Sequence, residues 1–558
     1  MSCKPKQRAE TNPSNGTQIP IREITFNAHI APLLWEKCAN CHRPGESAPF
    51  PLLTYDDAKK RAKQIMEVTG RGSMPPWMPV RDGRLKHERS LTSEEMALLQ
   101  QWVEEGAHEG TEALPAMPKW PAGWQLGQPD LILEPPKAYS LAASGVDEYR
   151  NLVVPCPMPR DRFVKAVEFQ PGTRAVHHAF IKVDKTGGSR SLDGKDGAPG
   201  FPGLHGNDSA QMPEGQLLSW QPGKMPATSP DGCWWLLPKN NNFVFQLHLQ
   251  PTGKAEEVKP RLGLYFTDEA PTKTPFKIQL VSYKFNIPAG AKRYLVQQAM
   301  VLPCDIDVLR ILPHAHFLAA KVEADALQPN GIVVPLINIP LWNFNWQGDY
   351  EYNTPLFLPK GTTVRMRYTY DNSADNPRNP NNPPVPIRYG PATTNEMAEL
   401  WLQTVPRDPA QRAALERAQD AQNARALKEL AELTLSQDPN DLQANIDAGK
   451  LMMREERLPA ALARFEVAIR AHPQSDQAHY YRAVTLRMMN RTVEAVTGFE
   501  TVLRLNPNHT RAHGNLAVMY GELGDLASCR NHVNEALLLD PHDPVALDLK
   551  KLLDQRHR

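Results

Sequence analysis

The sequence has no marked excess of either charge, no long apolar runs and few cysteines. Its 63 Lys and Arg residues balance 62 Asp and Glu residues, so we expect no electrostatic footprint for nucleic acid or an anionic membrane. No run of about 18 apolar residues occurs, which excludes a membrane-spanning helix. Among the 7 cysteines, Cys156, Cys233 and Cys304 can form at most one disulfide with one another, and the sequence does not determine which pair.

The amino-terminal segment also lacks the apolar stretch of a signal peptide. Either a leader lies upstream of this chain, or the protein is cytoplasmic. Cys3 precedes a polar segment, and residues 1–21 are expected to be a disordered region or a tether. Two interpretations of Cys3 stay open: the lipid-anchored cysteine of a trimmed lipoprotein, or a chance cysteine.

The length of the chain and the distribution of its prolines indicate how it divides into domains. At 558 residues it is too long for a single core, so three or four domains are expected. Its 53 prolines become rare after about residue 410, which favours loop-rich β structure first and helices afterwards.

A C-x-x-C-H motif stands near the amino terminus, formed by Cys38, Cys41 and His42. Two thiols at this spacing can add to the vinyl groups of haem, and the adjacent imidazole can bind the iron. A zinc site would need four ligands, and no second C-x-x-C or C-x-x-H lies nearby. A thioredoxin-like pair would need a βαβ unit, which this stretch does not resemble.

The surroundings of the motif predict helices at 29–38, 55–70 and 92–107, with "SMPPWMP" before the last of them. This order resembles a small class I cytochrome c domain over 22–112. The resemblance implies haem c attached outside the cytoplasm, with Met74 as the sixth iron ligand. Met66 and Met78 are rival ligands.

After a Pro-rich linker at 113–149, short alternating runs predict β-sandwiches up to residue 402. Adjacent histidines on a strand point to opposite faces, so His177 and His178 can share a metal only if the strand is twisted or ends there. His314 and His316 lie on one face. His248 follows an alternating strand, and His205 in a Gly-rich loop is given no role.

The ordered motifs "AVHH", "LHLQPTGK", "LPHAH" and "YGPATTNEM" resemble the copper type II, ascorbate-dependent monooxygenase family, which includes peptidylglycine and dopamine hydroxylases. That resemblance implies two jelly-roll-like sandwich domains, 150–285 and 286–402, each with one copper ion. It places one copper on His177, His178 and His248, and the other on His314, His316 and Met397, where dioxygen is activated to hydroxylate a C–H bond. The first copper supplies an electron, and ascorbate is the reductant.

Simpler interpretations exist for each part of this pattern. Paired histidines alone are more often structural, and Met397 lies in a predicted helix, where it would be a core residue. The positions that anchor a substrate carboxylate in peptide-hydroxylating members are here Leu312, Glu399 and Trp401. A glycine-extended peptide is therefore disfavoured, and the substrate, a small molecule or a peptide, stays unknown.

The carboxy-terminal part repeats every 34 residues, since Pro439, Pro473, Pro507 and Pro541 recur at that spacing. The period predicts tetratricopeptide repeats over 440–558, with 542–558 as a capping helix, after a helical connection at 403–439. Small and large apolar residues also recur in register, as in packed helix pairs: Gly449, Ala483 and Ala517; Ala461, Ala495 and Cys529; Phe465, Phe499 and Val533. By analogy, such an array presents a surface that binds a protein or peptide partner. The alternative is that it serves as a packing element against the predicted oxygenase domains.

The sequence therefore predicts a multidomain chain: an all-α cytochrome c-like domain, two jelly-roll-like β-sandwiches and an α-solenoid. The predicted function is copper-dependent monooxygenation in the periplasm or at the cell surface, with the fused haem as an alternative electron donor to ascorbate. The rival interpretation is an extracytoplasmic electron-transfer or metal-binding scaffold without hydroxylase activity.

Overall fold

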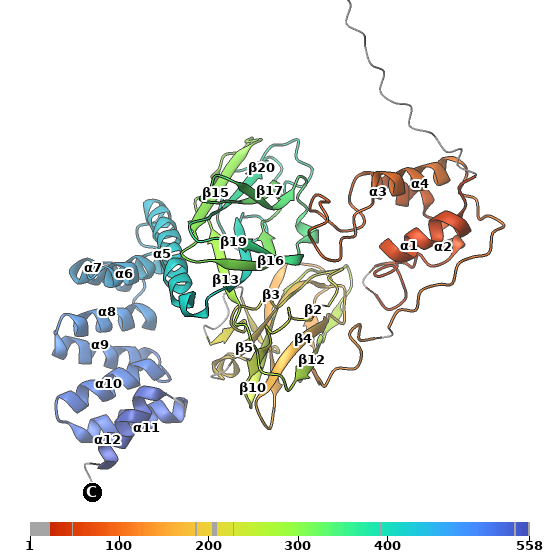
Figure 1. The fold of residues 1–558 in the computed structure, drawn as a ribbon. Helices are drawn as coiled ribbons and strands as arrows, with labels where there is room; N and C mark the ends of the chain where they lie inside the picture. Colours follow the sequence, from red (N-terminus) through yellow and green to blue (C-terminus); the bar gives the residue numbers. More distant parts are fainter. Residues whose placement is uncertain are drawn as a thin grey trace, which may run out of the picture. The chain divides into compact units, whose positions relative to one another are not determined.

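The computed structural model describes residues 23–46, 48–121, 123–184, 187–203, 209–226, 228–390, 392–540 and 543–555. Cys3, the expected tether at 1–21 and His205 lie outside these residues. The chain divides into two compact units. The first holds 1–77 and 87–127, and the second holds 78–86 and 128–558. Figure 1 draws the elements and labels many of them.

The first unit is helical, as the sequence predicted. A short π-helix, η1 (Phe26–Ile30), runs into α1 (Ala31–Lys37), and α2 (Tyr55–Lys59), α3 (Ala62–Gly70) and α4 (Ser93–Glu104) follow. Thr92 accepts a hydrogen bond from the backbone N–H of Glu95, whose side chain bonds back to the Thr92 N–H. This capping box satisfies two of the amide groups that a helix start leaves unpaired. Phe26, Leu34, Trp35 and Trp102 form the buried centre of the unit.

The second unit begins with a β-sandwich in which the histidine-bearing strands are central. Its two main sheets have the strand orders β1-β12-β4-β9 and β6-β3-β10-β5-β7, and β8 pairs with β5. Apolar side chains of both sheets fill the space between them. The strands are β1 (Leu131–Leu133), β2 (Tyr139–Leu141), β3 (Glu148–Cys156), β4 (Arg162–Gln170), β5 (Val176–Asp184), β6 (Phe201–Pro202), β7 (Ala210–Gln211), β8 (Ser219–Trp220), β9 (Trp235–Leu237), β10 (Asn241–Leu249), β11 (Glu256–Val258) and β12 (Arg261–Thr267).

A second β-sandwich follows, with the strand orders β13-β22-β16-β19 and β15-β20-β17-β18. Strands β16 and β22 lie side by side in antiparallel register, which brings residues distant in sequence to one end of the sheet. The strands are β13 (Phe276–Val281), β14 (Asn286–Ile287), β15 (Tyr294–Val301), β16 (Ile306–His314), β17 (Ala319–Leu327), β18 (Val333–Ile339), β19 (Tyr350–Leu358), β20 (Thr363–Tyr370), β21 (Ile387–Arg388) and β22 (Glu399–Pro406).

Several predicted boundaries differ from these elements. Strands β1 and β2 lie inside the predicted linker 113–149, and β13 lies inside the predicted first copper domain although it belongs to the second sandwich. Strand β22 continues to Pro406, beyond the predicted end at 402. Strand partners are chosen by pairing across the sheet, which local composition does not encode. The helix predicted around Met397 is also wrong, because the chain there leads into strand β22.

The predicted cytochrome-like range 22–112 is interrupted. Residues 78–86 belong to the second unit, and we call them the Met78–Lys86 insert. Leu85 forms an antiparallel bridge with Tyr352, so the insert extends the edge of β19. The prediction treated this stretch as a loop of the haem domain.

The helical run predicted from the 34-residue period is confirmed. After α5 (Arg412–Gln437), the first helices of successive pairs begin at Leu442, Asp476, Thr510 and Pro544, each 34 residues after the last. Gly449 is needed in its repeat, because a Cβ there would lie 2.5 Å from the Phe465 ring. The helices are α6 (Leu442–Arg454), α7 (Leu458–Ala471), α8 (Asp476–Met488), α9 (Thr492–Leu505), α10 (Thr510–Glu522), α11 (Leu526–Leu539) and α12 (Pro544–Gln555).

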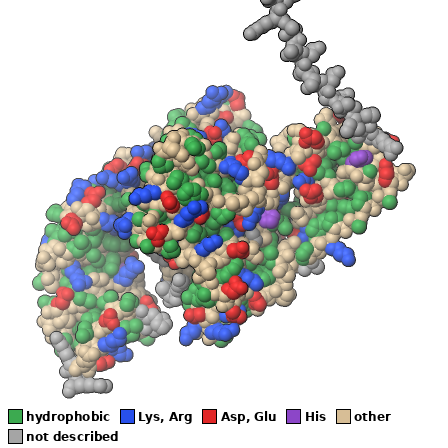
Figure 2. Space-filling model, viewed as in Figure 1, with side chains coloured by type: hydrophobic (Ala, Val, Ile, Leu, Met, Phe, Trp, Pro, Cys, Tyr) green, Lys and Arg blue, Asp and Glu red, His purple; other side chains and the backbone are tan. Residues whose placement is uncertain are grey.

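Three further observations bear on the predictions. Cys156, Cys233 and Cys304 are buried free thiols, so no disulfide joins them. Among the helices of the described residues, none is long and apolar enough to cross a membrane. Acidic and basic side chains are interspersed on the face seen in Figure 2, as the balanced composition predicts.

Candidate metal centres

Three histidines of the first sandwich converge on one point. His177 and His178 follow Val176 at the start of β5, and His248 lies near the end of β10. One ring nitrogen from each lies within 4.8 Å of the other two. The Nδ1 atom of His248 is 3.3 Å from Nδ1 of His177 and 3.2 Å from Nε2 of His178. The structure therefore brings together all three residues of the first predicted ligand set.

A β-bulge explains how adjacent histidines reach the same point. His248 pairs with His178 and Leu249 pairs with Val176, so His177 is the extra residue on β5. A bulge places two residues opposite one and redirects their side chains. It meets the condition derived from the sequence, that two neighbouring histidines can share a site only where their strand is irregular.

Asp147 supports the cluster from outside. Nε2 of His248 donates a hydrogen bond to the Asp147 carboxylate over 3.1 Å, which leaves the lone pair of Nδ1 directed at the other two histidines. The His248 ring also stacks on Tyr149, with centroids 4.5 Å apart. A carboxylate behind a ligating histidine fixes its tautomer and raises its basicity. Asp147 was not among the predicted site residues, although it lies just before β3, the strand that pairs with β10.

The cluster fits a metal ion with nitrogen ligands. The two histidines on β5 are kept neutral: burial, and next the neighbouring His248, lower the pKa of His177 to about 4 and that of His178 well below its usual range. Only neutral imidazole offers a lone pair to a metal. Three imidazoles at this spacing suit copper, zinc or iron.

A second pair of histidines lies on the second sandwich. His314 ends β16, His316 follows two residues later, and the ring centroids are 5.4 Å apart. Nδ1 of His316 donates to the carbonyl oxygen of Asn395 over 3.1 Å, and Nδ1 of His314 donates to the side-chain oxygen of Gln347. Both rings therefore keep Nε2 available as a ligand atom.

Met397 lies beside this pair. The backbone N–H groups of Met397 and His316 donate to the same oxygen of the Glu396 carboxylate, which holds the two segments close together. Met397 is buried, and its carbonyl accepts a hydrogen bond from the Tyr370 hydroxyl. A thioether next to two imidazoles is a donor set that favours copper(I).

Glu396 holds the two segments of this second cluster together. Its fully buried carboxyl group accepts hydrogen bonds from the backbone N–H groups of His316, Leu318 and Met397. Burial raises its pKa to about 8, against the opposing effect of these hydrogen bonds. The residue fixes the backbone geometry around the histidine pair and the methionine, and the sequence analysis did not identify it.

One segment reaches both clusters. We call residues Asn343–Glu351 the strap. The Phe344 ring stacks on His177 with centroids 5.0 Å apart, and it meets His316 edge-on at 5.6 Å. Phe344 is 2% exposed, so it fills the space between the two histidine clusters. Gln347, also in the strap, is the partner of His314 described above.

A small cavity of about 40 Å³ opens beside the histidines. Its lining includes His178, Phe180 and Trp220 of the first sandwich and Leu312, His314 and Gln347 of the second. Apolar side chains of this kind would receive an apolar part of a ligand.

The face around Leu312 does carry a cation. The ammonium group of Lys277 lies 4.3 Å from the ring centre of Trp401, and burial lowers its pKa to about 8 although Glu399 opposes that change. Leu312, Glu399 and Trp401 themselves carry no cation, but Lys277 reaches this face from the neighbouring strand β13.

The C-x-x-C-H motif lies directly after α1 in the first unit. Nδ1 of His42 donates to the carbonyl oxygen of Phe50 over 3.0 Å, which leaves Nε2 available to an iron ion. Burial lowers the pKa of His42 and raises that of Cys38 to about 12. Both features keep the imidazole neutral and the thiol protonated in the chain without haem.

Met74, the predicted sixth iron ligand, and its rivals Met66 and Met78 lie in different surroundings. Met74 is half-buried on the loop after α3, and its N–H donates to the Val68 carbonyl. Met66 lies on α3. Met78 belongs to the insert, where its sulfur accepts a hydrogen bond from the Asn343 N–H over 3.1 Å. This contact disfavours Met78 as an iron ligand.

Comparisons with known proteins bear on the helical repeats. No protein-family profile matches the sequence, and no curated protein matches it. Among solved structures, the chain is similar to one described as the crystal structure of MamA, at 18% identity and a TM-score of 0.23, over 27% of this chain and 85% of that one.

Another similar structure is the first TPR of Spaghetti (RPAP3) bound to the HSP90 peptide SRMEEVD, at 17% identity and a TM-score of 0.20, over 21% of this chain and 94% of that one. Scores this low carry no argument about function.

Proposed function

We propose that this chain is a copper-dependent monooxygenase that hydroxylates a C–H bond with dioxygen. The observation that carries the proposal is the three-histidine cluster backed by Asp147, with a His-His-Met set on the adjoining sandwich. His177, His178 and His248 would hold one copper ion, and His314, His316 and Met397 the other. Bound copper would supply one-electron redox chemistry and dioxygen activation.

The residues of the chain have distinct roles in this proposal. Asp147 and Gln347 hold the tautomers of His248 and His314, so that ligand nitrogens point inward. Phe344 excludes water between the two clusters. The cavity lined by Phe180 and Leu312 receives the substrate, and its size and apolar lining favour a short apolar segment next to the C–H bond.

The first unit would carry haem c, attached through Cys38 and Cys41, with His42 and Met74 as the residues that would hold its iron. The haem and ascorbate are alternative electron donors. Thioether attachment of haem c would place the protein in the periplasm or at the cell surface. The helical repeats would bind a protein partner, since such arrays present extended surfaces.

The rival function is an extracytoplasmic electron-transfer or metal-binding scaffold. Metal analysis of full-length protein from copper-fed cells separates the two, because the monooxygenase requires one iron and two copper ions per chain. Oxygen uptake with ascorbate across a substrate panel then tests hydroxylation. Copper-free protein, or bound copper without oxygen uptake for any substrate, would favour the scaffold.

A further inference from the structure

The Met78–Lys86 insert makes an extensive set of contacts with the second sandwich. The Val80 N–H donates to the Asn338 carbonyl over 2.8 Å, and the Asn353 N–H donates to the Arg84 carbonyl over 2.7 Å. The Lys86 ammonium group pairs with the Glu351 carboxylate at 2.5 Å. These contacts fix both ends of the insert on β18, β19 and the strap.

The strap, in turn, connects this insert to the candidate metal centres. Its first residue, Asn343, donates its N–H to the sulfur of Met78. The next residue, Phe344, stacks on His177. From Met78 to the three-histidine cluster, the path therefore consists of one hydrogen bond, one step along the backbone and one ring contact.

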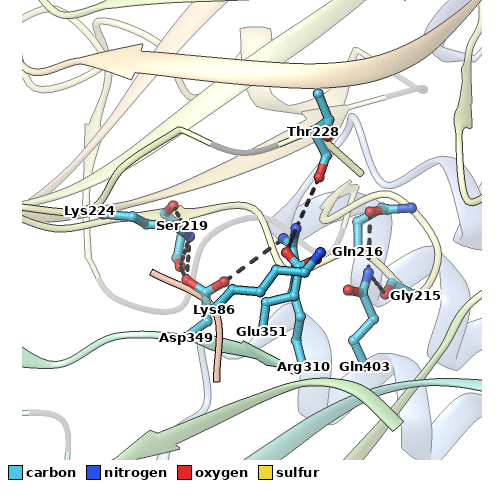
Figure 3. Close-up of polar contacts among 10 residues, drawn as sticks. All are labelled: Lys86, Gly215, Gln216, Ser219, Lys224, Thr228, Arg310, Asp349, Glu351 and Gln403. Carbon is cyan, nitrogen blue, oxygen red and sulfur yellow. Dashed lines mark hydrogen bonds and ion pairs between the residues drawn. The ribbon is translucent and has the colours of Figure 1, made fainter. Parts of the chain in front are cut away.

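Buried charges hold the strap in place (Figure 3). Asp349 is paired with Lys224 of the first sandwich, and Glu351 accepts hydrogen bonds from Arg310 at 2.6 and 3.1 Å. Arg310 also donates to the Thr228 carbonyl over 3.1 Å. Burial opposes the charge on Asp349, but Lys224 and Arg310 outweigh it and lower the pKa of Asp349. The strap is thus tied to both sandwiches and to the insert.

We infer that the insert and the strap form the electron route into the three-histidine site, with Met78 and Phe344 as positioning residues. The inference rests on the proposed function. Met78 is only four residues after Met74, the proposed iron ligand, so the covalent chain leads directly from the haem ligand loop into the insert. Electron transfer falls steeply with distance and is faster through bonded and closely packed atoms than through gaps. Between Met78 and His177 the route consists of short contacts, held in place by buried ion pairs.

The step itself is a transfer of one electron. Ferrous haem becomes ferric, and copper(II) held by His177, His178 and His248 becomes copper(I), without a bond formed or broken and without proton transfer. Ascorbate, a one-electron reductant, restores the ferrous haem. The route from Met78 onward does not include the predicted Pro-rich linker at 113–149.

The test uses full-length protein loaded with haem and copper(II), kept free of oxygen. A photogenerated reductant injects one electron, haem absorption reports its departure, and copper(II) loss is followed by electron paramagnetic resonance. The test variant is Phe344→Leu, and its control is Phe243→Leu, a buried phenylalanine on β10. Because a displacement of about 1 Å can cost up to roughly 100-fold in a positioned reaction, Phe344→Leu should slow haem reoxidation by about tenfold or more.

The control should reoxidise its haem at the wild-type rate. Met78→Leu, which keeps the side-chain volume but removes the sulfur acceptor, should be slowed less than Phe344→Leu, since the other insert contacts remain. Haem content, copper content and the copper(II) spectrum should be unchanged in all three variants.

The outcomes separate this inference from the proposed function. Wild-type rates in Phe344→Leu, with both metals bound, would overturn the route and leave the monooxygenase proposal intact. The route would also be overturned, and the monooxygenase proposal kept, if the haem of the wild-type protein kept its electron while ascorbate reduced the copper directly. Protein that binds neither haem nor copper would overturn both.

Discussion

Removal of the Asp147 charge offers a direct test of the three-histidine site. In Asp147→Asn the amide oxygen can still accept a hydrogen bond from His248 or from Gln250, whose side chains both donate to one Asp147 oxygen at 3.1 and 3.0 Å. The negative charge is lost, however, so the imidazole becomes a weaker donor to a metal. Changes of this kind typically weaken metal binding by about 10- to 100-fold.

For Asp147→Asn we expect the smaller of these two effects on metal binding, about tenfold. The Asp147 side chain is 30% exposed, so water already screens part of its effect on His248, and the hydrogen bond survives in the variant. We therefore expect copper affinity to fall about tenfold, which corresponds to roughly 1.4 kcal/mol. The site should otherwise be retained, because His177, His178 and His248 are unchanged.

The assay is an anaerobic copper(I) titration against a coloured chelator. A His314→Ala/His316→Ala background removes the second site, so that one dissociation constant is measured. Asp161→Asn is the control, since Asp161 caps a backbone N–H of the same sandwich at its surface and should bind copper as the background does. An unchanged dissociation constant for Asp147→Asn would refute the carboxylate–histidine–metal arrangement.

Three further predictions concern the other sites. Replacing Cys38 and Cys41 with Ala should abolish covalent haem on a denaturing gel, and surviving haem stain would disprove attachment there. Met397→His should keep its copper but lose most hydroxylation. The reduction potential of that copper should also fall, because a thioether ligand favours copper(I). An unchanged potential would make Met397 an ordinary core residue. Lys224→Met should lower the free energy of unfolding by about 3 kcal/mol, since it leaves Asp349 buried with one partner fewer, as measured by urea unfolding followed by tryptophan fluorescence. The folded-state pKa of Asp349 is lowered, so its stabilising effect is complete above the usual aspartate pKa and is lost as the pH falls through the lowered value.

The Lys224 prediction has a matched control. Breaking a buried ion pair costs about 3–5 kcal/mol of folding stability. For Lys224→Met we expect a loss near the lower end of this range, because Arg310 remains 3.9 Å from Asp349. Lys292→Met breaks an ion pair whose side chains are 65% and 77% exposed, and exposed pairs contribute less than about 1 kcal/mol. Equal losses in the two variants would show that burial is not what makes the Lys224 pair important.

Much of the fold could be predicted from local patterns. The 34-residue period fixed the start of every helix pair after residue 441, because each repeat uses the same small and large packing positions. The capping box at Thr92 and Glu95 marked the start of α4 for a similar local reason. Strand boundaries were less accurate, since β13 becomes a strand by pairing with β22, and β22 by pairing with both β13 and β16.

The sequence by itself determined which residues could bind metal: Cys38 and His42 in one motif, His314 and His316 at a two-residue spacing, and His177 beside His178. Those assignments depend on ligand chemistry and short-range geometry, which neighbouring residues encode. Only the tertiary structure decided what surrounds them. Asp147, Phe344 and the Met78–Lys86 insert come from segments far apart in the sequence, and strand pairing and buried ion pairs bring them to the histidines. No local pattern records such pairings, because the free energy that selects them comes from contacts formed only when the sandwiches are complete.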